Sequence, residues 1–250
     1  AVGMDCLQAN TTAGDNTAVG HSALENSTTG FSNTAVGKNA GVAITTGDEN
    51  VAIGMNAGTN LTTGNYNILI GHGPRTSQVD SEKQIIMGRD VVGAGGDHFT
   101  FGDGSTDCAI QFGATSITAP SDVRLKEDIQ DETVGLGFIN DLRPVTFQWK
   151  KEKDIPSDMN AHVANSEKRT MNGKHNHGFI AQEVKAVIDN HNMKDGFDMW
   201  TEDETDGRQR IGDASLMPIM VKAVQELSGK IDTLQAENTA LKARVKTLES

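Results

Sequence analysis

Side chains that commonly do chemistry are few in this 250-residue sequence, and most of them stand alone. Neither Cys6 nor Cys108 has a second cysteine at metal-ligand spacing, so neither a zinc site nor a disulfide framework is indicated. His175 and His177 could bind a metal as a pair. No carboxylate or cysteine lies at a spacing that would complete such a site, so solvated loop histidines are favoured. The acidic segment 202–207 lacks the alternating ligands of a calcium loop and predicts a solvated turn. We therefore expect no metal site and no cofactor.

A serine and a lysine near the middle of the chain form a different kind of candidate. Ser121 follows Pro120, and Lys126 lies five residues further on. A serine hydroxyl is a weak nucleophile at neutral pH, and a lysine can serve as its base only where burial or nearby cations lower the lysine pKa. Taken alone, Ser121-Asp122 is also an ordinary helix N-cap and Lys126 an ordinary surface lysine.

The composition of the chain changes at the same place. Residues 1–120 hold 19 of the 27 glycines but only 4 of the 22 Lys and Arg residues, and residues 121–250 hold the rest. A stretch so rich in glycine and so poor in aromatics cannot build a wide hydrophobic core, and it must gain order by repetition or assembly. We therefore place a domain boundary between Pro120 and Ser121.

Four separated motifs follow this boundary in order, at 121–129, 137–149, 178–184 and 216–227. Together they resemble the C-terminal intramolecular chaperone domain of phage tail spikes and tail fibres. That domain belongs to an autoproteolytic serine peptidase family with a further branch in a eukaryotic membrane-bound transcription factor. The resemblance covers about residues 115–235.

The resemblance implies that the chain cuts itself at the Pro120–Ser121 bond, with Ser121 as nucleophile and Lys126 as base. Pro120 fixes its own φ and pushes Ala119 toward an extended conformation, so the scissile carbonyl is expected on a stiff strand. Asp122, Gln182 and Glu183 are candidate supporting residues. For Gln182 and Glu183, orientation of the dyad and capping of a strand-to-helix turn both stay open.

A 17-residue repeat dominates the first third of the chain. Its glycines are Gly3, Gly20, Gly37, Gly54 and Gly71, and its asparagines are Asn16, Asn33, Asn50 and Asn67. The pattern predicts a β-solenoid over residues 1–71, with short strands that carry β-branched residues inward and ladders of hydrogen-bonded asparagines. The repeats resemble those of trimeric adhesin heads and tail fibres, although 17 residues is longer than the usual adhesin unit.

The remaining segments complete a predicted fold of two unlike halves. We expect the period to fail from Gly73 and residues 72–120 to form a β-rich shaft. Residues 121–215 would form an α+β chaperone domain, in which the polar segment 151–177 is predicted to be a hairpin. Residues 216–250 would form a helix and coiled coil.

Heptads support the coiled coil over about four repeats. The predicted core positions are Val224, Leu227, Ile231, Leu234, Asn238, Leu241, Val245 and Leu248. Peptide rules for this core lean toward a parallel dimer. The family resemblance and a fibre built from identical strands imply a homotrimer, which is our expectation. The fold class is therefore a mainly β, trimeric β-solenoid half followed by an α+β domain that ends in a trimeric parallel coiled coil.

The charge and hydropathy patterns narrow the function further. A net charge of −12 argues against nucleic-acid binding, and no segment has the apolar length of a membrane helix or the pattern of a signal peptide. We expect the C-terminal part of a viral tail fibre or spike, whose chaperone acts in the host cytoplasm during assembly and whose fibre part meets a host-surface receptor. Whether that receptor is a glycan stays open.

Two rival functions remain. In the first, the chain is a structural and adhesive fibre with a permanent trimerisation cap and an inert Ser121. The second, a membrane-anchored transcription factor precursor, is disfavoured because the sequence lacks a basic DNA-binding region and a membrane segment.

Overall fold

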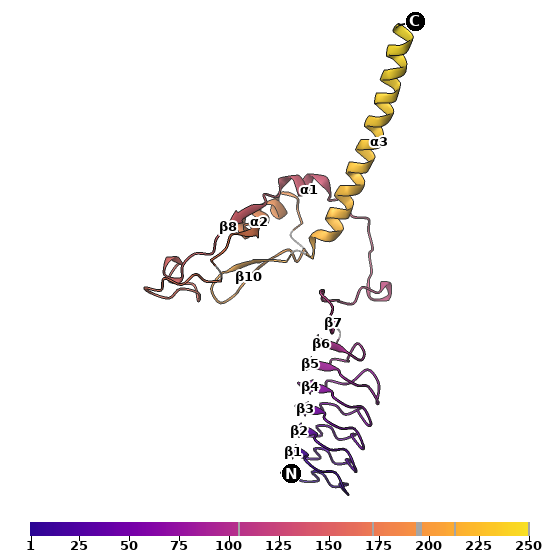
Figure 1. Ribbon diagram of the computed structural model, residues 1–250, viewed down its shortest axis with the longest axis vertical. Helices are drawn as coiled ribbons and strands as arrows, with labels where there is room; N and C mark the ends of the chain where they lie inside the picture. Colours follow the sequence, from indigo (N-terminus) through magenta and orange to yellow (C-terminus); the bar gives the residue numbers. More distant parts are fainter. Residues whose placement is uncertain (105, 172, 194–196, 213, 250) are drawn as a thin grey trace. The chain divides into compact units, whose positions relative to one another are not determined.

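The computed structural model describes residues 1–104, 106–171, 173–193, 197–212 and 214–249. The chain divides into two compact units, Ala1–Asp128 and Ile129–Ser250. The first unit is mainly β and the second contains the longer helices (Figure 1).

The first unit is a β-solenoid whose strands stack into one seven-stranded sheet. Strands β1 to β6 are parallel, and β7 returns antiparallel to β6. The strands are β1 (Thr17–Val19), β2 (Thr34–Val36), β3 (Val51–Ile53), β4 (Ile68–Ile70), β5 (Ile85–Arg89), β6 (His98–Asp103) and β7 (Thr106–Gln111). Because β7 reverses direction, the parallel stacking of coils ends at β6.

The side chains inside the coils differ from those we predicted. The central residue of each short strand points inward: Ala18, Ala35 and Ala52 are fully or almost fully buried. The flanking β-branched residues point outward, so the prediction that they face inward is wrong. Side chains alternate along a strand, and a three-residue strand has only one inward position. Alanine fills that position in β1 to β3 and Leu69 fills it in β4, and Leu24 and Ile44 belong to the same core.

Hydrogen-bond ladders join each coil to the next. The Asn50 N–H donates to Asn33 Oδ1 at 2.9 Å, and Asn50 Nδ2 donates to the Gly64 carbonyl at 2.8 Å. Asn33 and Asn67 make the equivalent bonds in their own coils. The predicted asparagine ladder is therefore confirmed.

The repeated glycines allow the coils to approach each other closely. Gly54 has φ +124°, and a Cβ at this position would lie 1.9 Å from the carbonyl oxygen of Gly71 in the next coil. The same arrangement recurs at Gly20 and Gly37. Only glycine combines this backbone conformation with this contact.

The 17-residue period continues one coil further than we predicted. Ile85 pairs with Ile68 in the β4–β5 ladder, and Gly88 repeats the conformation of Gly71 with φ +135°. The Gln84 N–H donates to Asn67 Oδ1 at 3.1 Å, as an asparagine would. The expected failure from Gly73 was wrong because the stacking depends on backbone N–H groups, which glutamine also supplies.

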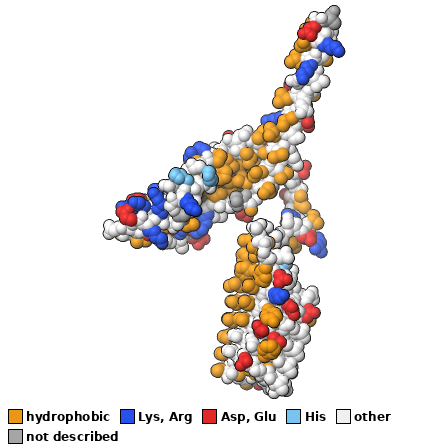
Figure 2. All heavy atoms as spheres, viewed as in Figure 1, with side chains coloured by type: hydrophobic (Ala, Val, Ile, Leu, Met, Phe, Trp, Pro, Cys, Tyr) orange, Lys and Arg blue, Asp and Glu red, His pale blue; other side chains and the backbone are white. Residues whose placement is uncertain are grey.

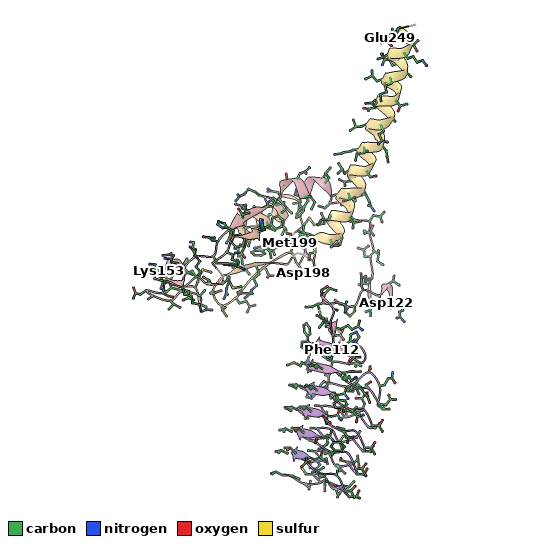
Figure 3. The ribbon with its side chains drawn as sticks, in the orientation of Figure 1. Phe112, Asp122, Lys153, Asp198, Met199 and Glu249 are labelled. Carbon is green, nitrogen blue, oxygen red and sulfur yellow. The ribbon has the colours of Figure 1, made fainter. Side chains whose placement is uncertain are left out.

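The second unit packs short helices and hairpins around a small core. Its elements are η2 (Glu152–Asp154), α1 (Leu136–Asp141), α2 (Ala181–Asn190), α3 (Leu216–Leu248), β8 (Val145–Phe147), β9 (Asn176–Gly178), β10 (Trp200–Glu202) and β11 (Gln209–Ile211). Phe138, Val184, Met199 and Ile219 are buried together in the core, and Figure 3 labels Met199.

Two antiparallel hairpins flank this core. Strand β8 pairs with β9, and further out Lys151 pairs with Arg169, so the segment between them is the hairpin arm that we predicted. Strand β10 pairs with β11.

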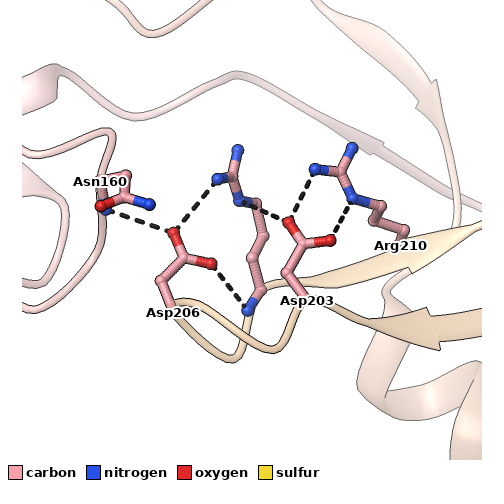
Figure 4. Close-up of polar contacts among 5 residues, drawn as sticks. Asn160, Asp203, Asp206 and Arg210 are labelled. Carbon is pink, nitrogen blue, oxygen red and sulfur yellow. Dashed lines mark hydrogen bonds and ion pairs between the residues drawn. The ribbon is translucent and has the colours of Figure 1, made fainter.

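A network of carboxylates and arginines joins the β10–β11 turn to the arm (Figure 4). Asp206 accepts from the Asn160 N–H at 3.3 Å and from Arg208 Nη2 at 3.1 Å. Asp203 binds Arg210 through two contacts of 2.7 Å. The acidic turn is therefore occupied by ion pairs within the chain.

Helix α3 leaves most of its length uncovered. Only Leu216, Ile219 and Ala223 are buried, all within its first turns. The heptad residues beyond them are exposed, among them Val224 at 65 % and Leu234 at 62 %. The long helix predicted from the heptads is thus present, and its apolar stripe has no partner within the described part of the chain. None of the described helices is long and apolar enough to cross a membrane.

Candidate active site

The junction, by which we mean the segment around Pro120 and Ser121, comes shortly after the last strand of the solenoid sheet. Thr118 forms an antiparallel bridge with Ala109, in which the two backbone N–H groups donate at 2.7 and 2.8 Å. Pro120 lies two residues beyond this bridge. The carbonyl of the predicted scissile bond therefore follows closely on a hydrogen-bonded segment.

A single helical turn then bends the chain back on itself. This turn is η1 (Val123–Leu125), and Asp122 is its N-cap, whose carboxylate accepts from the Arg124 N–H at 2.8 Å. The Lys126 N–H donates to the Val123 carbonyl at 3.2 Å. Capping by a short acidic side chain is what this position favours, so the N-cap interpretation holds for Asp122.

The turn brings the two predicted catalytic side chains together. Lys126 Nζ donates to Ser121 Oγ at 2.8 Å. Both residues are exposed. This is the contact that a serine nucleophile and a lysine base require, although an ammonium group must first lose its proton before the lysine can accept one from the hydroxyl.

Asp122 is held by a second contact in addition to the cap. Its carboxylate binds the Arg124 guanidinium, with Nη2 at 2.6 Å (Asp122 is labelled in Figure 3). The hydrogen bonds from the Arg124 side chain and backbone hold the pKa of Asp122 below its usual range. Asp122 thus fixes the turn as a charged cap rather than contacting the hydroxyl itself.

The segment around the dyad is open, and exposed apolar side chains alternate there with charged ones such as Arg124 and Glu127. Val123 is 66 % exposed, Leu125 70 % and Ile129 64 %. Three large apolar side chains so close together on an uncovered segment are typical of a surface that another chain covers.

Gln182 and Glu183 lie in the first turn of α2, in the other unit. Glu183 binds Arg143, with Nε to Oε2 at 2.9 Å, and hydrogen bonding from Arg143 lowers the pKa of Glu183. Gln182 is exposed. We did not anticipate the role of Arg143, although its charge and its position just before Pro144 in the second motif are visible in the sequence.

The remaining candidate ligands do not gather into a site. Within the described ranges, no three histidine, cysteine or carboxylate side chains come together so that they could hold a metal ion. The two cysteines, Cys6 and Cys108, are both free and half-buried.

Comparison with known proteins identifies the segment that carries this geometry. Residues 121–193 match the family model described as chaperone of endosialidase, a peptidase family. The matched segment begins at the Ser121 of the dyad, and the match is to the family that the motifs predicted. No curated protein and no solved structure matches the chain. The family supports a role as a tail-fibre chaperone.

Proposed function

We propose that this chain is the C-terminal part of a viral tail fibre or spike, whose chaperone domain drives homotrimerisation and then releases itself by cutting the Pro120–Ser121 bond. The observation that carries cleavage is the 2.8 Å contact between Lys126 Nζ and Ser121 Oγ. It stands at the first residue of the segment that matches the chaperone family.

The chemistry is an acyl shift followed by hydrolysis. Ser121 Oγ bonds to the Pro120 carbonyl carbon while its proton passes to the Lys126 amine. The bond from this carbon to the Ser121 nitrogen then breaks, the nitrogen takes up the proton, and an ester remains. Water adds to the ester and releases a Pro120 carboxylate, and Ser121 keeps its hydroxyl and a new amino terminus.

Cleavage requires assembly first. In a single chain both Ser121 and Lys126 are exposed to water, and a lysine can accept the serine proton only as the neutral amine, which burial favours. The uncovered Val123, Leu125 and Ile129 supply an apolar surface that neighbouring copies of the junction would cover. Covering this surface removes water from the dyad and favours the neutral amine.

The exposed stripe of α3 provides the assembly contact. Seven apolar heptad residues and Asn238 lie on the uncovered part of the helix. Three parallel copies would bury these side chains, and Asn238 would fix the register at some cost in stability. The fibre part would then face a host-surface receptor as part of the virion.

A second function is a fibre with a permanent cap and no cleavage. The observation that favours it is the capping role of Asp122, because a capped turn with a surface lysine needs no catalytic purpose.

Electrophoresis of the expressed full chain separates the two functions. We expect wild type to yield two fragments that correspond to residues 1–120 and 121–250, with masses that place the cut at Pro120–Ser121. Ser121→Ala should leave a single full-length band. Lys126→Arg is the matched control for charge: it keeps a cation beside the hydroxyl but cannot supply a neutral base, so it too should stay uncut.

The opposite outcomes are equally clear. A Lys126→Arg chain that cuts at the wild-type rate would exclude Lys126 as the base. Wild type that assembles but never splits would establish the permanent cap instead.

A further inference from the structure

The outward face of the solenoid sheet carries two continuous columns of uncharged side chains, which we call the outer sheet face. The ladder registers align Thr17, Thr34, Val51, Ile68, Ile85, Phe99 and Ile110 in one column, and Val19, Val36, Ile53, Ile70, Met87, Phe101 and Cys108 in the other. Figure 2 shows regular rows of hydrophobic side chains along this unit.

This face is uncovered in a single chain. Val36 is 37 % exposed, Ile53 38 % and Met87 39 %. Parallel sheets are almost always covered on both faces, and here only the inner face is covered, by the core of the coils. The outer face is therefore open to a partner.

The repeat itself distinguishes this face from the rest of the surface. The position just before each repeated glycine is always apolar, from Val2 to Met87. The residue just after each of these glycines is, in chain order, Met4, His21, Lys38, Met55, His72 and Arg89. The same coil thus accepts a charge on one side of the glycine and has none on the other.

The side chains of the outer sheet face also grow along the stack. One column runs from threonine through valine and isoleucine to Phe99, and the other from valine to Met87 and Phe101. Larger apolar side chains remove more surface from water, so contact across this face is strongest at the end that precedes the junction.

We propose that the outer sheet face packs against the same face of two further copies, parallel and in register, and that this packing spreads from the junction toward the N-terminal coils. The proposal rests on the proposed homotrimer and adds the surface and the direction of its assembly. A copy of this chain is the partner that fits, because an identical stack presents the same columns of side chains, in the same order and at the same spacing of about 4.8 Å.

The outer sheet face is too small to hold copies of the chain together without a second contact, which α3 provides. Six steps of about 4.8 Å make it roughly 30 Å long and about two side chains wide, which is a few hundred Å². A stable interface buries about 800 Å² on each partner. The face is therefore too small to hold copies together alone, and it closes once α3 has brought them together.

Paired lysine substitutions in the full chain test the surface. Ile53→Lys places a charge in the outer sheet face, whereas Met55→Lys places it where a neighbouring coil already has Lys38. Both side chains are exposed, so neither change disturbs the fold of one chain. Val19→Cys in a Cys6→Ser background adds a reporter thiol two ladder steps N-terminal to Ile53 in the same column. In the assembled protein we expect Ile53→Lys to speed the reaction of this thiol with a thiol reagent about tenfold or more and to leave that of Cys108 within about twofold. Met55→Lys should leave both within about twofold.

Cross-linking of the native cysteines tests the parallel register. Cys108 lies on the outer sheet face opposite Phe101, whereas Cys6 points inward and donates to the Gly20 carbonyl. A short bismaleimide should join two chains through Cys108, in wild type and in Cys6→Ser but not in Cys108→Ser. A trimer by sedimentation with no such cross-link and equal effects of both lysines would overturn the proposal while the trimer stands. A monomer by sedimentation would remove the proposed function as well.

Discussion

The two units of this chain are stabilised in different ways. The solenoid joins neighbouring coils through neutral amide and backbone hydrogen bonds, repeated at each coil. The second unit has a small core around Phe138, and its outlying segments are held largely by ion pairs such as Arg143 with Glu183. The solenoid is thus stabilised by the same hydrogen bonds repeated in each coil, and the second unit by individual contacts between particular residues.

This difference explains why the fibre needs a chaperone. Within one chain, covalent connection fixes which coil follows which. Between chains, a shift by one coil places nearly the same side chains opposite each other, so the coils alone discriminate poorly between registers. The heptads of α3 contain a single asparagine at Asn238, and a unique polar residue in such a core specifies one register.

The largest loss of stability is expected from a substitution at the point where neighbouring coils lie closest together. Gly54→Ala places a Cβ 1.9 Å from the Gly71 oxygen at a φ of +124°, and it should cost about 3–5 kcal/mol in the stability of the solenoid. Gly14→Ala is the control, because a Cβ there meets nothing within 4 Å. Hydrogen exchange of the coil peptides measures both.

The two units should respond to this change separately. Both tryptophans, Trp149 and Trp200, lie in the second unit, so their fluorescence reports that unit alone. If Gly54→Ala shifted the tryptophan transition as much as the exchange of the coils, the contrast between two independently stabilised units would be wrong.

Substitution of one asparagine in the ladder should cost less stability than Gly54→Ala. Asn50→Ala leaves the Asn67 N–H and the Gly64 carbonyl without their buried partner, which should cost about 2–4 kcal/mol. Thr45→Val removes a hydroxyl that donates to the Thr62 carbonyl, but that carbonyl keeps the Thr45 N–H. Its cost should stay below about 1 kcal/mol. Equal losses in denaturant unfolding would show that the ladder has no special role.

The sequence predicted the repeat well because repetition itself is the signal. Evenly spaced glycines and asparagines indicated the coil and its ladder. They did not reveal which side of the strand faces inward, because a three-residue strand such as β2 has too few positions for alternation to be read. The continuation to Gly88 was missed because Gln84 replaces the expected asparagine while its backbone makes the same bond.

The candidate site was predictable for a different reason. Ser121 and Lys126 came from the resemblance of the motifs, and their contact depends on η1, whose Asp122 cap is readable from sequence. The partner of Glu183 was not, because Arg143 lies 40 residues away and only the fold brings them together. Cleavage by the dyad itself stays a prediction.

The smallest expected effect is a difference between the two units in how their stability responds to acid. Hydrogen bonds from Lys151 and Lys153 lower the pKa of Glu167 to about 2. Burial would raise the pKa of Asp206, but hydrogen bonds from Asn160 and Arg208 outweigh it and leave that pKa low. Carboxylates with lowered pKa values stabilise the folded state above their ordinary pKa near 4, and this stabilisation is lost as the pH falls through the lowered values.

The arm of the second unit should therefore lose hydrogen-exchange protection between about pH 4 and pH 2, while the coils keep theirs. The Asn50 ladder carries no titrating group, so protonation leaves its bonds intact. Asp206→Asn should loosen the arm already at neutral pH, because the neutral amide oxygen accepts the Asn160 N–H bond more weakly than the carboxylate does. Coil amides that lost protection in the same pH range as the arm would mean that charge, and not repetition, holds the solenoid together.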